Sequence, residues 1–259
     1  MTRKPAPAPA PATATARRKR PEPQEAQPAY GRVAADLEQR ILKRTLKPGD
    51  PLPSETELAR QFDVNRSTVR EAVRRLESAG LVGRAAGTKR LRVTRPGQSA
   101  TVSSMSRALT LDDVTFIELW EAMLAIAPRT AALAAAHSRP ENLERLELCI
   151  RQVETARSSE GAVGGVVDFF GSLAATSANR VLVLAMQPVT RLLAPSLRRM
   201  IDRVPQGRSR IVVAQRCVVE ALRKGDAEEA LTWMTRHVQD FRRGYEVAGI
   251  PLETHAADV

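Results

Sequence analysis

Residues 48–87, "PGDPLPSETELARQFDVNRSTVREAVRRLESAGLVGRAAG", decide the fold because they mark the starts of two short helices in succession. Ser54 is followed three residues later by Glu57, a capping box in which each side chain satisfies a free backbone N–H, so a helix is predicted to begin here. After a short turn, Asn65 is placed to cap a second helix. Two short helices joined by so tight a turn are typical of a helix-turn-helix.

The second helix has an apolar side and a basic, hydroxyl-bearing side. The apolar residues recur at helical spacing and are predicted to face a core: Val69, Ala72, Val73 and Leu76. The opposite side and the helix start carry Arg66, Ser67, Arg70 and Arg74. A recognition helix places its first residues in the DNA major groove, where Arg bonds guanine through two hydrogen bonds and Ser or Thr reaches bases or phosphates. The pattern therefore predicts a helix that contacts DNA.

The flanking segments complete a larger unit. Residues 30–44 have the apolar spacing of an amphipathic helix. Gly80 is positioned to end the basic helix in the left-handed conformation. Beyond it, two β-like runs, 81–84 and 90–94, lie on either side of a small-residue turn centred on Gly87, which predicts a hairpin wing with basic residues at its tip. Three helices and this wing make a winged helix-turn-helix.

The net charge of +11 is confined to the first 96 residues. Residues 1–28 hold six Lys or Arg against two acids, residues 29–96 hold fifteen against eight, and residues 97–259 hold nineteen against nineteen. This asymmetry predicts that the N-terminal part meets a polyanion and that the C-terminal part has another partner. A membrane surface is not the expected partner, because it would require an apolar helix face that enters the lipid, whereas the periodicity here indicates a folded core face. No run of 18 apolar residues and no apolar leader occurs, so the protein is expected in the cytoplasm.

These patterns divide the chain into five parts. Residues 1–28 alternate Pro and Ala and then cluster Arg and Lys, as a disordered basic tail does. Residues 29–96 are predicted to form the winged helix-turn-helix, and residues 97–110, which come after "RP", a linker. Residues 111–248 show helical spacing almost throughout and predict an all-α bundle, followed by a polar tail over 249–259. The expected fold class is mainly α.

Residues 30–94 closely resemble the winged helix-turn-helix of the GntR family of bacterial transcription regulators, whose motif runs approximately "pGd.LPSE..LA..f.VsR.TVReAl..L...Glv....G". The resemblance implies contacts with operator DNA from the recognition helix and from a wing in the minor groove. The implied residues are Arg66, Ser67, Thr68 and Arg70, with Gly87, Thr88 and Lys89 on the wing. The family often has a DNA-contacting Arg directly after "PSE". This chain has Thr56 there, which implies an altered operator preference.

The segments "ELWEAMLAIAPRTAALAAAH" and "EALRKGDAEEALTWMTRHV" resemble the all-α effector domain of the FadR subfamily, the FCD domain. Many of its members hold a metal through an Asp and three His at the floor of the ligand cavity. The matching positions here are Val166, Phe170, Gln215 and His237, and Met123 replaces a family Arg. Because His237 alone remains of that ligand set, no metal or other cofactor is expected. The resemblance then implies a more apolar cavity and an acyl or lipid-like effector.

Together these features predict a homodimeric transcription regulator, a repressor, that binds a pseudo-palindromic operator of double-stranded DNA and responds to a small-molecule effector. An effector that prefers the DNA-incompetent arrangement would release the operator. A metal-dependent or organic-acid-responsive regulator of the same family is an alternative, as is an architectural protein that binds DNA regardless of sequence. An enzyme is not expected, because the chain has no Gly-rich phosphate loop or nucleophile elbow.

Overall fold

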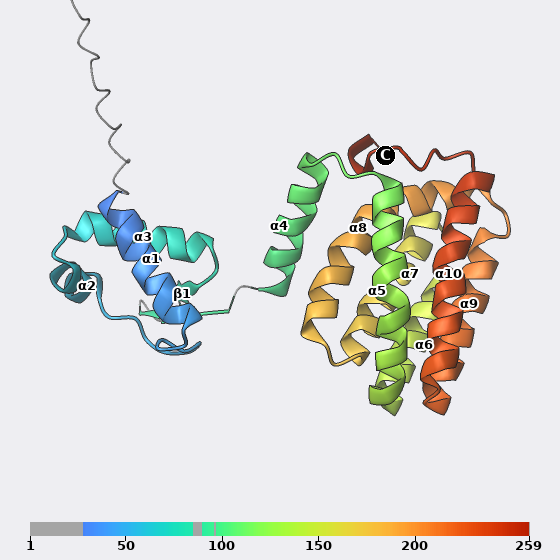
Figure 1. The fold of residues 1–259 in the computed structure, drawn as a ribbon, viewed down its shortest axis with the longest axis horizontal. Coiled ribbons are helices and arrows are strands. Elements are labelled where there is room, and N and C mark those ends of the chain that lie inside the picture. Colours follow the sequence, from blue (N-terminus) through green and yellow to red (C-terminus); the bar gives the residue numbers. More distant parts are fainter. Residues whose placement is uncertain (1–27, 85–89, 96, 259) are drawn as a thin grey trace, which may run out of the picture. The chain divides into compact units, whose positions relative to one another are not determined.

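The computed structural model describes residues 28–84, 90–95 and 97–258. The chain divides between residues 95 and 96 into two compact units, and each is described by itself. Both units are mainly helical, and the described residues of the N-terminal unit also form a two-stranded sheet (Figure 1). This architecture confirms the predicted fold class.

The N-terminal unit is a helix-turn-helix with a hairpin. It consists of α1 (Ala29–Leu42), α2 (Glu55–Phe62), α3 (Arg66–Ser78), β1 (Val82–Arg84) and β2 (Leu91–Val93). The two strands pair antiparallel, with Val82 opposite Val93. The core lies where α1 and α3 pack together, and it includes Leu37, Leu58, Val69 and Leu76, all at most 2 % exposed. Burying each such aliphatic side chain contributes about 1.5–3 kcal/mol.

The helix boundaries follow the capping signals, with one exception. The Ser54 backbone N–H donates to Glu57 Oε2 at 2.7 Å, and Ser54 Oγ accepts from the Glu57 N–H at 3.2 Å, so the capping box forms. Gly80 follows α3 with a φ of 69°, as predicted. Asn65 occupies the N-cap position but its side chain makes no capping hydrogen bond, contrary to prediction. The backbone sets a cap position, whereas the bond also requires a suitable rotamer, which the pattern does not specify.

The two cap positions should differ in their effect on stability. Ser54→Ala removes a bond that is formed and is expected to lower the free energy of unfolding by ~1 kcal/mol. Asn65→Ala removes no capping bond and should cost clearly less. Urea unfolding of both variants checks this, and equal losses would contradict the assignment. Hydrogen bonds from the Ser54 backbone and hydroxyl hold the pKa of Glu57 below its usual value, so the cap weakens only as pH falls through that lowered pKa.

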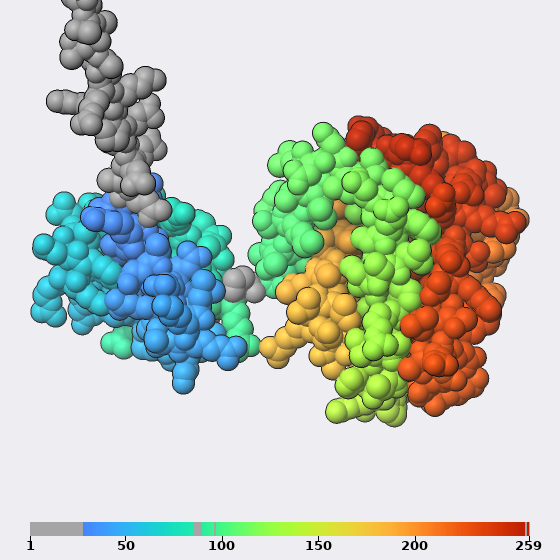
Figure 2. All heavy atoms as spheres, in the orientation of Figure 1, coloured from blue at the N-terminus to red at the C-terminus, as the bar shows by residue number. Residues whose placement is uncertain are grey.

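The C-terminal unit is an all-α bundle. Its helices are α4 (Gln98–Leu111), α5 (Phe116–His137), α6 (Pro140–Thr155), α7 (Ser159–Thr176), α8 (Arg180–Arg203), α9 (Gly207–Lys224) and α10 (Ala227–Val247), followed by the short 3-10 helix η1 (Ala256–Asp258). Helices α5 and α10 lie side by side along the bundle, as the space-filling view also shows (Figure 2). Among the described residues, no helix is both long and apolar enough to cross a membrane.

The segment predicted as a linker over 97–110 is a helix. Gly97 is the N-cap of α4, and α4 packs against α8. The helix-breaking residues Pro and Gly end at Gly97, and residues 98–111 contain neither of them, so a helix can form there. Val102, which is 1 % exposed, is the apolar residue of this helix that is buried. The linker prediction was therefore wrong for these residues.

The segment predicted as a polar tail over 249–259 is packed against the start of α5. The first-turn N–H groups of Phe116 and Ile117 donate to the carbonyls of Thr254 and Leu252, at 3.1 and 2.9 Å. These N–H groups have no partner within their own helix, so a returning chain satisfies them. Ile250 is 6 % exposed and joins the core of the bundle. This contact between distant parts of the chain has no local sequence signal.

Candidate functional site

The basic side of α3 is exposed to solvent, opposite its buried apolar side. Arg66, Ser67, Arg70 and Arg74 are exposed and Thr68 is half-buried. The opposite side is held in the core by the four buried residues Val69, Ala72, Val73 and Leu76. The arginines therefore project from a helix whose orientation is fixed by packing, which keeps their donors available to an external anion.

Two of these arginines have acidic neighbours. Arg70 Nη2 lies 3.3 Å from Oε2 of Glu55 at the start of α2, and Arg74 Nη1 lies 3.6 Å from Glu71. The Arg70 side chain remains 55 % exposed and that of Arg74 68 %. Ion pairs this exposed are weak, so both guanidinium groups can exchange a carboxylate for a phosphate or a base.

Thr56 and Arg66 line one open groove of about 970 Å³. Its other walls come from the segment that leads into α2 and from the hairpin, including Arg84 and Arg90. Arg84 and Arg90 lie in the two β-like runs predicted on either side of the wing turn, but they are not among the residues predicted to contact DNA. The wing-tip residues predicted to contact DNA, Gly87, Thr88 and Lys89, lie outside the described residues. The groove joins the helix start to the base of the hairpin.

The five residues predicted to bind the effector lie on four helices and are all buried. Met123 of α5, with Val166 and Phe170 of α7, lines a cavity of about 20 Å³, here called the central cavity. Its other walls are apolar or hydroxyl-bearing: Val167, Thr190, Leu193, Leu197, Phe241 and Tyr245. His237 of α10 lies beside it, with its ring stacked on Phe170 at a centroid distance of 5.7 Å. Gln215 of α9 is 0 % exposed and does not line the cavity.

Gln215 and His237 carry buried polar atoms without partners. Within the described part of the chain, neither amide atom of Gln215 nor Nε2 of His237 has a hydrogen-bond partner. An unsatisfied buried polar group costs about 1–3 kcal/mol, so three such atoms need an explanation. Burial lowers the pKa of His237 to about 4 against the opposing effect of Asp240. The imidazole is therefore neutral near pH 7.

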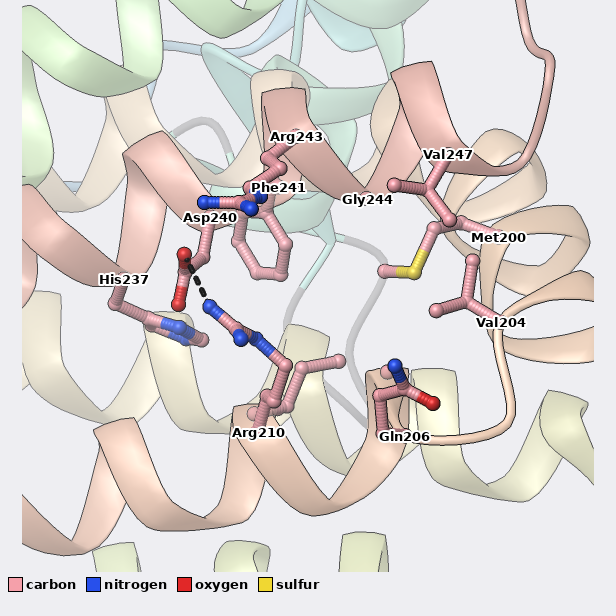
Figure 3. Close-up of a pocket in the computed structure, with 12 residues that line it drawn as sticks. Met200, Val204, Gln206, Arg210, His237, Asp240, Phe241, Arg243, Gly244 and Val247 are labelled. Carbon is pink, nitrogen blue, oxygen red and sulfur yellow. Dashed lines mark hydrogen bonds and ion pairs between the residues drawn. The ribbon is translucent and has the colours of Figure 1, made fainter.

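A second hollow, here called the side pocket, opens between the end of α8, the start of α9 and α10. Its volume is about 160 Å³. Figure 3 shows His237, Asp240 and Arg210 toward one end, with Arg210 paired to Asp240 at 2.7 Å, and Met200, Val204 and Val247 toward the other. Gln206, beside Val204, and Arg243 also line the pocket, so polar groups occur around it as well as at the Arg210 end. Its residues are separated in the sequence, so no motif signals it.

The residues at the site do not fit a bound metal. Val166 and Phe170 carry no donor atom, and Phe170 covers one face of the His237 ring. Within residues 28–84, 90–95 and 97–258, no group of three or more His, Cys, Asp or Glu is placed to hold a metal ion. Structural and catalytic metals require three or four converging protein ligands, which the described residues do not supply.

Comparison with known proteins identifies both units. Residues 29–88 match the model of bacterial regulatory proteins of the gntR family, and residues 118–240 match the FCD domain. An uncharacterized HTH-type transcriptional regulator of Mycobacterium tuberculosis is 31% identical over 155 residues, which span 59% of this chain and 63% of that protein, less than two thirds of its length. A putative L-lactate dehydrogenase operon regulatory protein of Escherichia coli is 29% identical, covering 80% of this chain and 82% of its own. The solved structure of a Streptococcus agalactiae GntR protein superposes with a TM-score of 0.57 at 29% identity, covering 83% of this chain and 99% of that one.

Proposed function

The chain belongs to the GntR family of bacterial regulatory proteins, as a DNA-binding transcriptional regulator with a C-terminal FCD domain, and we propose that it is a homodimeric repressor of the FadR subfamily. Its effector is small and largely apolar, and binding of the effector releases the operator. Regulators of this type bind DNA through the helix-turn-helix and effectors through the FCD domain. They are not enzymes. A repressor works where the chromosome is, so the protein acts in the bacterial cytoplasm.

The observation that carries the DNA-binding role is the exposed basic side of α3 beside the groove that Arg66 shares with Arg84 and Arg90. We assign Arg66, Ser67, Thr68 and Arg70 to base and phosphate contacts, and Arg74 and Thr56 to positions at the edge of the interface. We assign the wing-tip contacts with DNA to Gly87, Thr88 and Lys89. Phosphate contacts set the register, and the base contacts supply specificity.

Selection of binding sites from random DNA with the full-length chain tests the proposal. A dimeric regulator should recover a pseudo-palindrome with half-sites about one helical turn apart, because the two-fold symmetry of the protein is matched by the DNA. Sedimentation should show two chains on each site. Recovery of no preferred sequence would instead favour an architectural protein.

Arg74 provides a prediction about salt dependence. Its side chain is the more exposed of the two paired arginines on α3, at 68 %, and it lies further from the helix start than Arg66. Arg74→Ala should weaken binding to selected and scrambled DNA alike, and should reduce the slope of log K against log salt by about one unit. Fluorescence anisotropy over a salt series measures this slope. A loss confined to the selected sequence would instead identify Arg74 as a base contact.

The effector role rests on the central cavity, which is lined by Met123, Val166 and Phe170 and by no charged residue. A carboxylate buried there would have no cation beside it, and an unpaired buried charge is very unfavourable. An apolar effector therefore fits the cavity better than an organic acid does. An effector can shift the regulator only by the difference in its affinity for the two arrangements. Because the central cavity of about 20 Å³ holds little more than one water molecule, the effector must also open or reshape it.

A further inference from the structure

Helices α4 and α8 carry an excess of positive charge within a unit whose total charge is zero. Together the two helices hold six Arg and one acidic residue, Asp202. Residues 97–259 hold nineteen basic and nineteen acidic residues, so the other elements of this unit carry the balancing acidic excess. Because α4 packs against α8, the positive charge is gathered in one part of the bundle.

Three of these arginines form a row along the outer face of α8, here called the arginine row. Arg180, Arg191 and Arg198 are all exposed. They are separated by eleven and seven residues, which is close to three and two whole turns of a helix, so the three side chains leave α8 in nearly the same direction. At a rise of about 1.5 Å per residue, the row is about 27 Å long.

The arginine row differs from the exposed arginines of α9 in having no ion pairs. On α9, a carboxylate oxygen lies within 2.8 Å of each of Arg210, Arg216 and Arg223. In the part of the chain that the structure describes, no acidic side chain forms such a pair with the row, and Asp202, four residues beyond Arg198, is no exception. Arg180 is also the first residue of α8, where the helix dipole disfavours a cation. Its charge therefore does not serve the helix itself.

We propose that the arginine row is a second DNA-contacting surface, which binds the phosphate backbone beside the operator. DNA is already the partner of this chain, and it carries one negative charge for about every 1.7 Å of its axis, so it offers phosphates along the whole row. Helix α4, which packs against α8, begins three residues after Arg95, the last residue of the N-terminal unit. This short connection keeps the DNA that flanks a bound operator at a high local concentration around the C-terminal unit.

The arginine row adds affinity without adding sequence information, because contacts with phosphates do not distinguish bases. It also makes binding at the operator more sensitive to salt, since each neutralised phosphate releases counterions. The inference goes beyond the proposed function, which places every DNA contact in the N-terminal unit. It assigns a further contact to the FCD domain.

Anisotropy titrations of the full-length chain on two duplexes provide the test. One duplex ends with the selected operator, and the other extends the operator by about two helical turns on each side. The parent chain should bind the longer duplex about tenfold more tightly, with a salt slope steeper by about 0.9 units for each phosphate that the row contacts. The triple variant Arg180→Gln, Arg191→Gln, Arg198→Gln should lose both differences. Its stability in urea should be unchanged, since the three side chains are exposed.

The triple variant Arg210→Gln, Arg216→Gln, Arg223→Gln is the matched control. It removes the same charge from the same unit, but from arginines that already have carboxylate partners. This control should keep the preference for the longer duplex. Arg191→Glu, a charge reversal at the middle of the row, should reduce the preference with one substitution, and it decides the question if the triple variant of the row does not fold.

Equal affinity of the parent chain for the two duplexes would overturn the inference, as would a preference for the longer duplex that the row variant retains or that both triple variants lose equally. Loss of the dimer by the row variant, in sedimentation without DNA, would instead identify a second copy of the chain as the partner of the row. The shorter duplex keeps the inference apart from the proposed function. A chain that prefers the operator to a scrambled duplex but gains nothing from flanking DNA contradicts only the inference, whereas a chain without operator preference contradicts the proposed function.

Discussion

Arg66→Ala should weaken binding to the selected operator by about 1–3 kcal/mol and relax the base preference at one position of each half-site. Arg66 is the first residue of α3, is exposed, and lines the groove between the helix start and the hairpin. An Arg that reads a guanine donates two hydrogen bonds to it, and alanine would leave these base acceptors without partners. Binding to scrambled DNA should fall much less, because the loss there is limited to one positive charge.

Arg75→Ala is the matched control for this variant. Arg75 lies on the same helix and is also exposed, so its removal deletes the same charge. Nine residues separate it from Arg66, which is two and a half helical turns, and so the two side chains leave the helix in opposite directions. Anisotropy titrations at one salt concentration compare the parent and both variants. An Arg66→Ala chain that binds as tightly as the parent would show that the recognition helix is wrongly placed.

Gly165→Ala should lower the free energy of unfolding by about 1–3 kcal/mol, because α6 and α7 approach too closely to admit a methyl group. A Cβ at this position would lie 2.8 Å from Val153 Cγ2, 2.9 Å from the Val153 nitrogen and 3.0 Å from the Cys149 carbonyl oxygen. Two of these atoms belong to the backbone of α6, so a side-chain rotation cannot relieve the contact. Gly165 is adjacent to Val166, so the variant should also disturb the central cavity.

Gly171→Ala provides the control, since it adds the same methyl group to the same helix. Apart from its chain neighbours and the nearby backbone of its own helix, no atom lies within 4 Å of a Cβ at that position, and alanine is the better helix former by about 1 kcal/mol. Urea unfolding should therefore show opposite signs for the two variants. If both stabilise the chain, the close approach of α6 and α7 is not present in solution.

Local signals predicted the N-terminal unit in most of its detail. The Ser54 and Glu57 capping box, the left-handed Gly80 and the apolar spacing of α3 each depend on residues within one or two turns, and the structure contains all three. The side-chain bond expected from Asn65 is absent because its rotamer depends on surroundings that no short pattern describes. The exposed basic side of α3 follows directly from the burial of the other side.

The features missed by the sequence analysis depend on contacts between distant residues. Helix α4 is held by α8, and the C-terminal segment is held by the free N–H groups of α5. The two hollows are divided by Phe241, whose neighbours come from separate helices. Family positions did group Met123, Val166 and Phe170, which line one cavity, but Gln215, predicted with them, does not line it.

The ratio of affinities for the selected operator and a scrambled duplex, measured for the full-length parent chain at 150 mM salt, tests the central claim most directly. A sequence-reading regulator should prefer its operator by roughly 10³ or more. A ratio near one would mean that the basic side of α3 binds phosphates alone, and it would contradict the assignment of this chain as a regulator that reads a specific site.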